Sequence, residues 1–102
     1  MIKKFNAIIF LGTSKIQVPS ILSAKKNGYK IIGIDKNKNA TGKKFCDYFF
    51  NFSANDTIKI IKNISKLTNI NIISIWANND IFILSKIKLE SKLNIKNSIS
   101  LV

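Results

Sequence analysis

The feature that most constrains this chain is an apolar segment near its start, Phe5–Leu11, which is interrupted only by Asn6 and ends at Gly12. Its length suits a β-strand, and the absence of polar alternation predicts that this strand is buried on both faces. Strands of that kind occur in parallel sheets that carry helices on both sides. The segment therefore predicts an α/β fold.

The segments that follow alternate between strand-like and helix-like patterns. Further strands are expected at 29–35, 47–52 and 71–77, with a final short strand at 95–102. Helices are expected over 16–27, from Asp56 to about Leu67, and from 78–80 to about Leu93. Pro19 suits the first turn of the first helix, and Gly28 suits its end. This order predicts one domain of three layers, a Rossmann-like open parallel sheet of four to five strands with helices on both faces.

Apolar stripes predict which face of the later helices is buried. In the helix after Asp56 the stripe consists of Ile58, Ile61, Ile64 and Leu67, widened by Ile60. Ser53 or Asn55 is expected to cap the start of this helix, where Asp56 also suits the helix dipole. In the last helix the inner face is expected to carry Ile81, Leu84 and Ile87.

Composition limits the chemistry that is open to the chain. There is no histidine, which excludes sites that depend on imidazole, and a single thiol, Cys46, which excludes an internal disulfide. Without a partner for activation, Cys46 is expected to be a small buried apolar residue and not a nucleophile. The longest uninterrupted apolar run, Ala7–Leu11, is far shorter than a membrane span. We therefore expect a soluble cytoplasmic protein without a membrane partner.

The positive charge has a compositional explanation. All 17 basic residues are lysine, the formal net charge is +12, and Ile, Lys and Asn make up 51 of the 102 residues. These three residue types have AT-rich codons, and the lysines are spread along the whole chain. Arginine, whose planar group reads base edges, is absent. We interpret the charge as a solvated surface, and binding to nucleic acid is the less favoured interpretation.

Ligands of open parallel sheets bind at the carboxyl ends of the strands, which here are the segments 12–17, 35–42 and 77–80. The first of these contains Gly12, Thr13, Ser14 and Gln17. Its amides and hydroxyls either receive a phosphate or carboxylate or form only a tight turn and a helix start. The turn has one of the three glycines that the dinucleotide fingerprint needs, which disfavours a nicotinamide or flavin cofactor.

The other two segments carry polar side chains that are also candidates for binding. Asp35 ends the second strand, where it either binds a ribose-like ligand or bonds to amides of its own loop, and Asn37 follows in that loop. Asn78 and Asp80 follow the strand at 71–77, where they are either binding residues or caps of the last helix. With the first segment they complete the candidate site, in which we predict substrate or anion binding.

Five short motifs together resemble a known family. They are IIFLG at 8–12, QVP at 17–19, GYKIIGID at 28–35, NKNATG at 37–42 and CDYFF at 46–50. They resemble the N-terminal pre-ATP-grasp domain of ATP-grasp ligases, and most of all the carbamoyl-phosphate-synthase-like carboxylate–amine ligases. The most specific element is IDxNxNAxG, in which Lys38 and Thr41 replace the two prolines of the family's NPNAPG loop. The NND turn at 78–80 resembles the family's Gly-Thr-Asp, with Asp80 the literal match.

The resemblance covers essentially the whole chain, so residues 1–102 are expected to form a single pre-ATP-grasp domain without the ATP-grasp catalytic domain. It implies that the complete enzyme uses ATP and Mg²⁺ to activate a carboxylate as an acyl phosphate and passes it to an amine. The present residues would supply scaffold and part of the pocket for a small-molecule substrate, with no catalytic or metal-binding residue and no cofactor of their own. The expected partner is the ATP-grasp catalytic domain or subunit, without which the chain is expected to be inactive.

Two further hypotheses stay open from the sequence. One is a free-standing nucleotide- or anion-binding regulatory domain that uses the Gly12 turn and Asp35. The other is an electrostatic binder of nucleic acid. Because an isolated sheet of this type leaves strand edges and an apolar face uncovered, self-association into a homo-oligomer is also expected.

Overall fold

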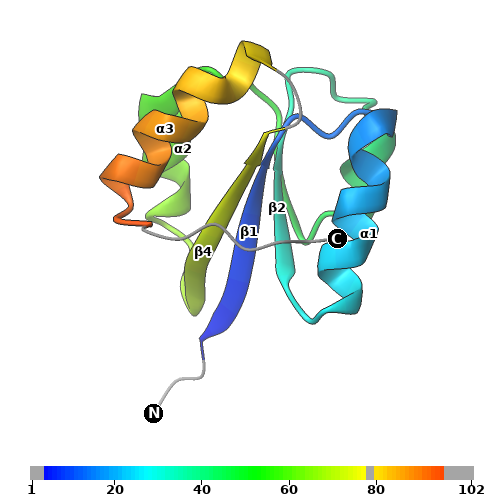
Figure 1. Cartoon of the computed structure of the whole chain (residues 1–102), viewed down its shortest axis with the longest axis horizontal. Coiled ribbons are helices and arrows are strands. Elements are labelled where there is room, and N and C mark those ends of the chain that lie inside the picture. The colour runs from blue at the N-terminus through cyan, green and yellow to red at the C-terminus, as the bar shows by residue number, and fades with distance from the viewer. Residues whose placement is uncertain (1–3, 78–79, 96–102) are drawn as a thin grey trace.

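The computed structural model describes residues 4–77 and 80–95, and these form a four-stranded sheet in the order β3-β2-β1-β4 (Figure 1). The strands are β1 (Phe5–Leu11), β2 (Lys30–Ile34), β3 (Tyr48–Phe50) and β4 (Ile70–Ala77). All neighbouring pairs are parallel, which confirms the predicted sheet. The strand expected at 95–102 is not tested, because beyond Ile95 it lies outside the described residues.

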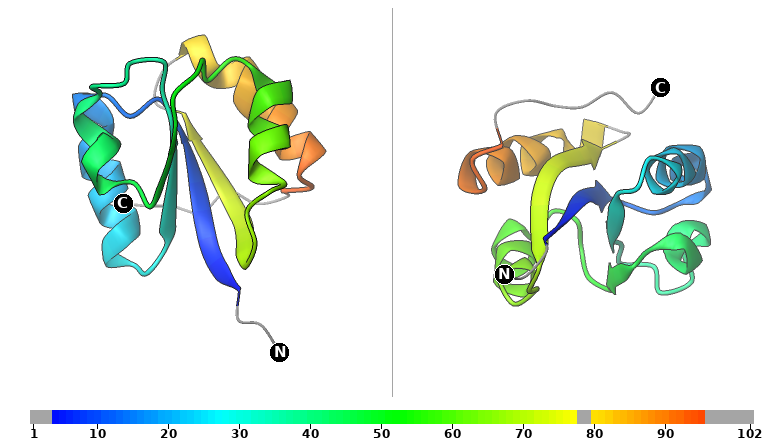
Figure 2. Two further views of the ribbon diagram at one scale, coloured as in Figure 1. Left: turned by 180° about the vertical axis from the view of Figure 1, so that it is seen from behind. Right: turned by 90° about the horizontal axis from the view of Figure 1, so that it is seen from below.

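Helices cover both faces of the sheet, which confirms the predicted three layers. Helix α1 (Val18–Lys26) lies on one face, whereas α2 (Thr57–Ile64) and α3 (Ile83–Lys92) lie side by side on the other, as the views in Figure 2 show. Three 3₁₀ turns complete the described part of the chain, at Lys15–Gln17, Thr41–Phe45 and Asp80–Phe82.

Strand β1 is the centre of the core, as its uninterrupted apolar sequence predicts. All its residues from Ala7 to Leu11 are fully buried. Alternate side chains pack on opposite layers: Ala7, Ile9 and Leu11 join the cluster under α2 and α3, and Ile8 and Phe10 join the cluster under α1. Because β1 lies between β2 and β4 in the sheet, its carboxyl end, Leu11–Gly12, lies between the carboxyl ends of those two strands.

The limits of α1 follow its sequence signals. Pro19 lies within the first turn, where its missing amide hydrogen is not needed. Gly28 follows the helix with φ +88°, a conformation that favours glycine, and its amide donates to the Lys25 carbonyl at 3.0 Å. The helix itself starts at Val18, two residues later than predicted, because a 3₁₀ turn comes first.

Helix α2 differs from its prediction in its cap and in one apolar residue. Asp56, and not Ser53 or Asn55, caps the helix: its carboxylate accepts from the Lys59 amide at 3.1 Å. Ser53 instead accepts from the Asn55 amide within the preceding turn. Of the predicted stripe, the residues from Ile60 onward pack on the core, but Ile58 is 82% exposed.

Helix α3 turns the opposite face to the sheet from the one that we predicted. Ile81, Leu84 and Ile87 are exposed, whereas Phe82, Ser85 and Leu89 face the core. The Ser85 hydroxyl donates to the Asn55 amide oxygen at 2.8 Å, which makes burial of this small polar residue favourable. Because α3 carries two apolar stripes, the second one is left on the surface.

Candidate functional site

The turn after β1 is built around Gly12. Its φ of +91° is a left-handed conformation, and its amide donates to the Ile34 carbonyl at 2.8 Å, which ties the turn to the end of β2. A side chain here would also approach the Phe82 ring at 3.2 Å. Gly12 is therefore required both by the backbone conformation and by the approach of Phe82.

Asp35 bonds to the adjacent turn and to its own loop. One carboxylate oxygen accepts from the Thr13 amide at 2.8 Å and lies 3.3 Å from the Thr13 hydroxyl. The other accepts from the Asn37 amide at 2.9 Å. The donors at Thr13 that an anionic ligand would need are thus already matched by a carboxylate of the protein. A phosphate placed there would meet a like charge, so the geometry favours a neutral or donor group.

Gln17 and Ser14 have different environments although both lie just before α1. Gln17 is buried; its amide nitrogen donates to the Leu11 carbonyl at 3.4 Å, and its side-chain oxygen has no hydrogen-bond partner among the described residues. Ser14 is exposed, and its hydroxyl does not cap the 3₁₀ turn that follows. Its carbonyl accepts from the Gln17 amide at 2.9 Å.

The loop that carries the NKNATG motif folds back onto the turn after β1. Asn37 accepts from the Asn39 amide at 3.0 Å, and the Gly42 amide donates to the Thr13 carbonyl at 2.7 Å. A Cβ on Gly42 would lie 2.6 Å from that same carbonyl. The fold thus joins Gly12, Thr13, Asp35 and Asn37 into one hydrogen-bonded unit.

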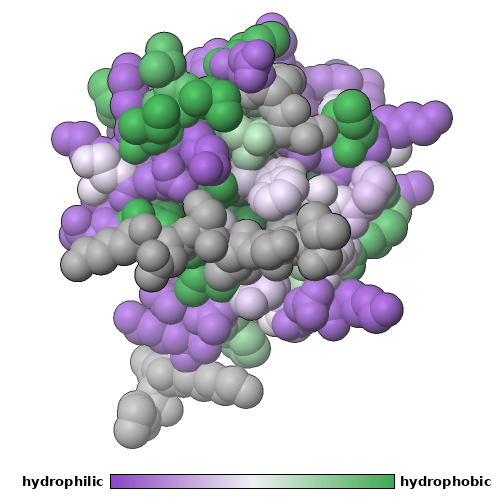
Figure 3. All heavy atoms as spheres, viewed as in Figure 1, coloured by the Kyte–Doolittle hydropathy of each residue, from purple (hydrophilic) through white to green (hydrophobic). Residues whose placement is uncertain are grey.

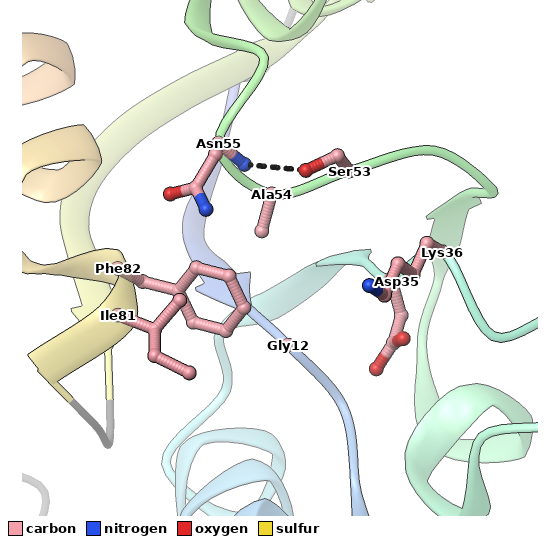
Figure 4. A pocket seen from close by; sticks show the side chains of 8 residues that line it. All are labelled: Gly12, Asp35, Lys36, Ser53, Ala54, Asn55, Ile81 and Phe82. Carbon is pink, nitrogen blue, oxygen red and sulfur yellow. Dashed lines mark hydrogen bonds between the residues drawn. The ribbon is translucent and has the colours of Figure 1, made fainter.

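A cavity of about 180 Å³ lies beside this unit (Figure 4). Its lining residues come from four segments, after β1, after β2, before α2 and before α3: Gly12, Asp35, Lys36, Ser53, Ala54, Asn55, Ile81 and Phe82. In Figure 4, Asn55, Ile81 and Phe82 lie on one side of the space, and Asp35 and Lys36 lie on the other. The cavity thus has its charged residues on the β2 side, whereas the α3 side is apolar apart from Asn55.

The cavity contains two of the predicted site residues and several that the sequence analysis missed. Gly12 and Asp35 line it, whereas Thr13, Ser14, Gln17 and Asn37 do not. Asp80 is exposed at the start of the 3₁₀ turn before α3 and does not line the cavity, and Asn78 lies outside the described residues. The signal in the sequence for Asn55 was its position at a predicted helix start, and that position predicts a helix cap.

Cys46 has the environment of a packed residue. Its thiol lies 3.4 Å from the Gly42 carbonyl, to which it donates. Burial, together with the nearby negative charge of Asp47, raises the pKa of this thiol to about 11. Such a thiol is almost entirely protonated near neutral pH. The side chain is half-buried, whereas the sequence predicts that it is buried.

Of the described lysines, Lys36 alone lines the cavity. Four other lysines lie over phenylalanine rings at about 5 Å: Lys30 over Phe5, Lys43 over Phe49, Lys44 over Phe45 and Lys59 over Phe52. In the described part of the chain, no three Cys, Asp or Glu side chains are grouped to hold a metal ion. No helix of residues 4–77 and 80–95 has the length and hydropathy needed to cross a membrane.

Comparison with known proteins gives a match in fold. No protein-family model matches the sequence, and no curated protein does. Among solved structures, the ADP complex of N5-carboxyaminoimidazole ribonucleotide synthetase matches with a TM-score of 0.65 and 19% identity, over 91% of this chain and 23% of that chain. The N5-carboxyaminoimidazole synthetase from Staphylococcus aureus, complexed with ADP, matches with a TM-score of 0.52 and 20% identity, over 72% and 20%.

These matches agree with the resemblance found in the sequence motifs. The chain spans about a fifth to a quarter of each synthetase, and the match is consistent with the pre-ATP-grasp N-terminal domain of such an enzyme. At this level of identity the likeness is one of fold. The chain therefore shares the α/β fold of the matched part of these synthetases.

Proposed function

We propose that these residues act as the substrate-side domain of an ATP-grasp carboxylate–amine ligase, in which the nucleotide is held by another region. The observation that carries the proposal is the joining of the IDxNxNAxG loop to the Gly12 turn through Asp35 and Gly42. Two of the residues that resemble the family in sequence, Gly12 and Asp35, also line the cavity. The fold match to an ATP-grasp ligase supports the same assignment.

The described residues do not fit ATP and Mg²⁺. The amide of Thr13 bonds to Asp35, and within residues 4–77 and 80–95 no three acidic or thiol side chains are grouped to coordinate a divalent cation. Phosphate oxygens placed at this turn would also face the Asp35 charge. In the complete ligase, ATP and Mg²⁺ would accordingly be bound by an ATP-grasp domain or subunit, which is the partner we propose.

The cavity suits part of a small organic substrate. Its volume of about 180 Å³ is below the range of complete drug-sized pockets, as expected where a second domain supplies the remaining wall. Phe82 and Ala54 offer apolar contact, and Asp35 and Asn55 offer hydrogen-bonding groups. An amine- or hydroxyl-bearing group facing Asp35 matches this lining better than a phosphate does.

Calorimetry and an ATP hydrolysis assay on the 102-residue chain test the proposal. We expect no turnover and no binding of magnesium–ATP tighter than millimolar. Micromolar binding accompanied by turnover would contradict it. Thermal shift with a panel of nucleotides addresses the regulatory-domain alternative, because a true ligand at about 100 times its dissociation constant stabilises the folded state by about 2.7 kcal/mol.

A further inference from the structure

The outer face of α2 and α3 carries apolar side chains that are exposed in the described part of the chain. Ile58 is 82% exposed, Leu84 is 71% exposed, and Ile87 is 55% exposed. We call these three residues the α2–α3 face. Figure 3 shows hydrophobic side chains gathered over α3 at the upper left of the molecule. Large apolar side chains that are exposed close together often mark a site of interaction.

The arrangement of α3 makes this exposure specific. The helix buries Ser85 and Leu89 against the core and directs Leu84 and Ile87, which are larger than serine, away from it. Leu84 and Ile87 lie one turn apart on the same side of the helix. The second apolar stripe is therefore a separate surface, and it does not contribute to the core of these residues.

A groove between the two helices gives the face its shape. It has a volume of about 310 Å³ and is lined by Thr57, Ile58, Ile61, Ile87, Lys88, Ser91 and Lys92. Its floor is apolar, and its charged residues are two lysines with no carboxylate among the lining residues. Leu84 is not part of this lining; it precedes Ile87 by three residues in α3, so a partner helix that fills the groove would have to extend by one turn to contact it. A concave apolar groove between helices suits a row of side chains from a partner helix.

Charge decides between the occupants of the groove. A second copy of this chain would bring lysines of the same type against Lys88 and Lys92, and each copy has a net charge of +12. A flat lipid surface would leave the floor of the groove unfilled. We propose that the α2–α3 face binds an amphipathic protein helix whose apolar stripe is flanked by Asp or Glu.

An NMR titration of the ¹⁵N-labelled 102-residue chain tests this proposal. The probe is a synthetic helical peptide of about four turns with a leucine stripe flanked by glutamates, and its control has lysine in place of each glutamate. We expect the acidic peptide to shift the amides of Ile58, Leu84 and Ile87. The lysine peptide should bind at least about tenfold more weakly, and added salt should weaken the acidic peptide.

Two matched variants make the test specific. Leu84→Ser should weaken peptide binding at least about tenfold. Ile16→Ser, which changes a residue of equal exposure (71%) outside this face, should leave it unchanged. Equal binding of both peptides, shifts that map elsewhere, or no shift at millimolar peptide would each overturn the proposal. The proposal would also be overturned if the chain formed a dimer by light scattering, or bound phosphatidylserine vesicles, and Leu84→Ser abolished that association.

Discussion

Replacing Gly42 with alanine measures how firmly the motif loop is held on the turn after β1. The Gly42 amide donates to the Thr13 carbonyl at 2.7 Å, and an added Cβ would lie 2.6 Å from that carbonyl and 2.9 Å from Ile21 Cδ1. The carbonyl is backbone, so it cannot move aside in the way that the end of a flexible side chain can. The substitution must therefore push the loop away and break the hydrogen bond.

The expected loss of stability combines two effects. Overpacking of a buried position costs about 1–3 kcal/mol, and a lost amide hydrogen bond costs about 1 kcal/mol. We expect Gly42→Ala to lower the free energy of unfolding by about 2–4 kcal/mol, and Tm by roughly 10–25 °C in a domain of this size. Urea denaturation followed by the fluorescence of Trp76 and by circular dichroism measures the change.

Gly28→Ala is the matched control, because it separates steric clash from backbone strain. Gly28 has φ +88° but no atom within 4 Å of an added Cβ, whereas Gly42 is not among the described glycines with positive φ. Gly28→Ala should cost about 1–2 kcal/mol through its left-handed conformation alone. If the free energy of unfolding of Gly42→Ala were within about 0.5 kcal/mol of the wild-type value, the tight packing of the loop on Thr13 would be refuted.

Three other substitutions or reactions have defined outcomes. Asp35→Ala should lower the free energy of unfolding, measured by urea titration, by about 2–3 kcal/mol because the amides of Thr13 and Asn37 lose a charged acceptor. Asp35→Asn should lower it less because the amide side chain keeps one acceptor oxygen. Equal effects of the two substitutions would contradict the bonding described. Asp56→Ala should cost about 1 kcal/mol by loss of the α2 cap, while Asp56→Ser should restore most of it. The pKa of the Cys46 thiol is raised from 9.0 to about 11. Alkylation of this thiol by iodoacetamide should therefore be slow at pH 8 and should accelerate as the pH rises toward 11. At pH 8, a rate like that of an exposed thiol would contradict the burial of the Cys46 side chain.

The sequence was informative where one pattern dominated a segment. The apolar run of β1 has no polar alternation, so burial on both faces was the one arrangement that suited it, and the structure confirms it. Gly28 and Pro19 limited α1 for equally local reasons. From such elements the order of layers follows, because strands that alternate with helices form parallel sheets.

Other features depend on contacts between distant segments. Helix α3 carries two stripes, and the inner one includes Ser85, whose burial depends on a hydrogen bond to Asn55, 30 residues earlier in the chain. No periodicity in α3 alone predicts that bond. Likewise, Gly12 and Asp35 were expected at the carboxyl ends of two strands, but the sequence left open whether Asp35 binds a ligand or a backbone amide, which proves to include that of Thr13. Phe82 reaches the cavity from the turn before α3, and no pattern in the sequence marked its side chain as part of a site.

The amide of Thr13 provides the most direct test of the central claim, which is that this cavity serves a small-molecule substrate and not the nucleotide. In ¹⁵N NMR spectra of the 102-residue chain, millimolar magnesium–ATP or inorganic phosphate should leave the amides of Gly12 and Thr13 unshifted, because Asp35 already occupies the Thr13 donor. Small amines and alcohols should instead shift Gly12, Asn55 and Phe82, which line the cavity. Saturable shifts of Thr13 with magnesium–ATP at micromolar affinity would contradict the claim.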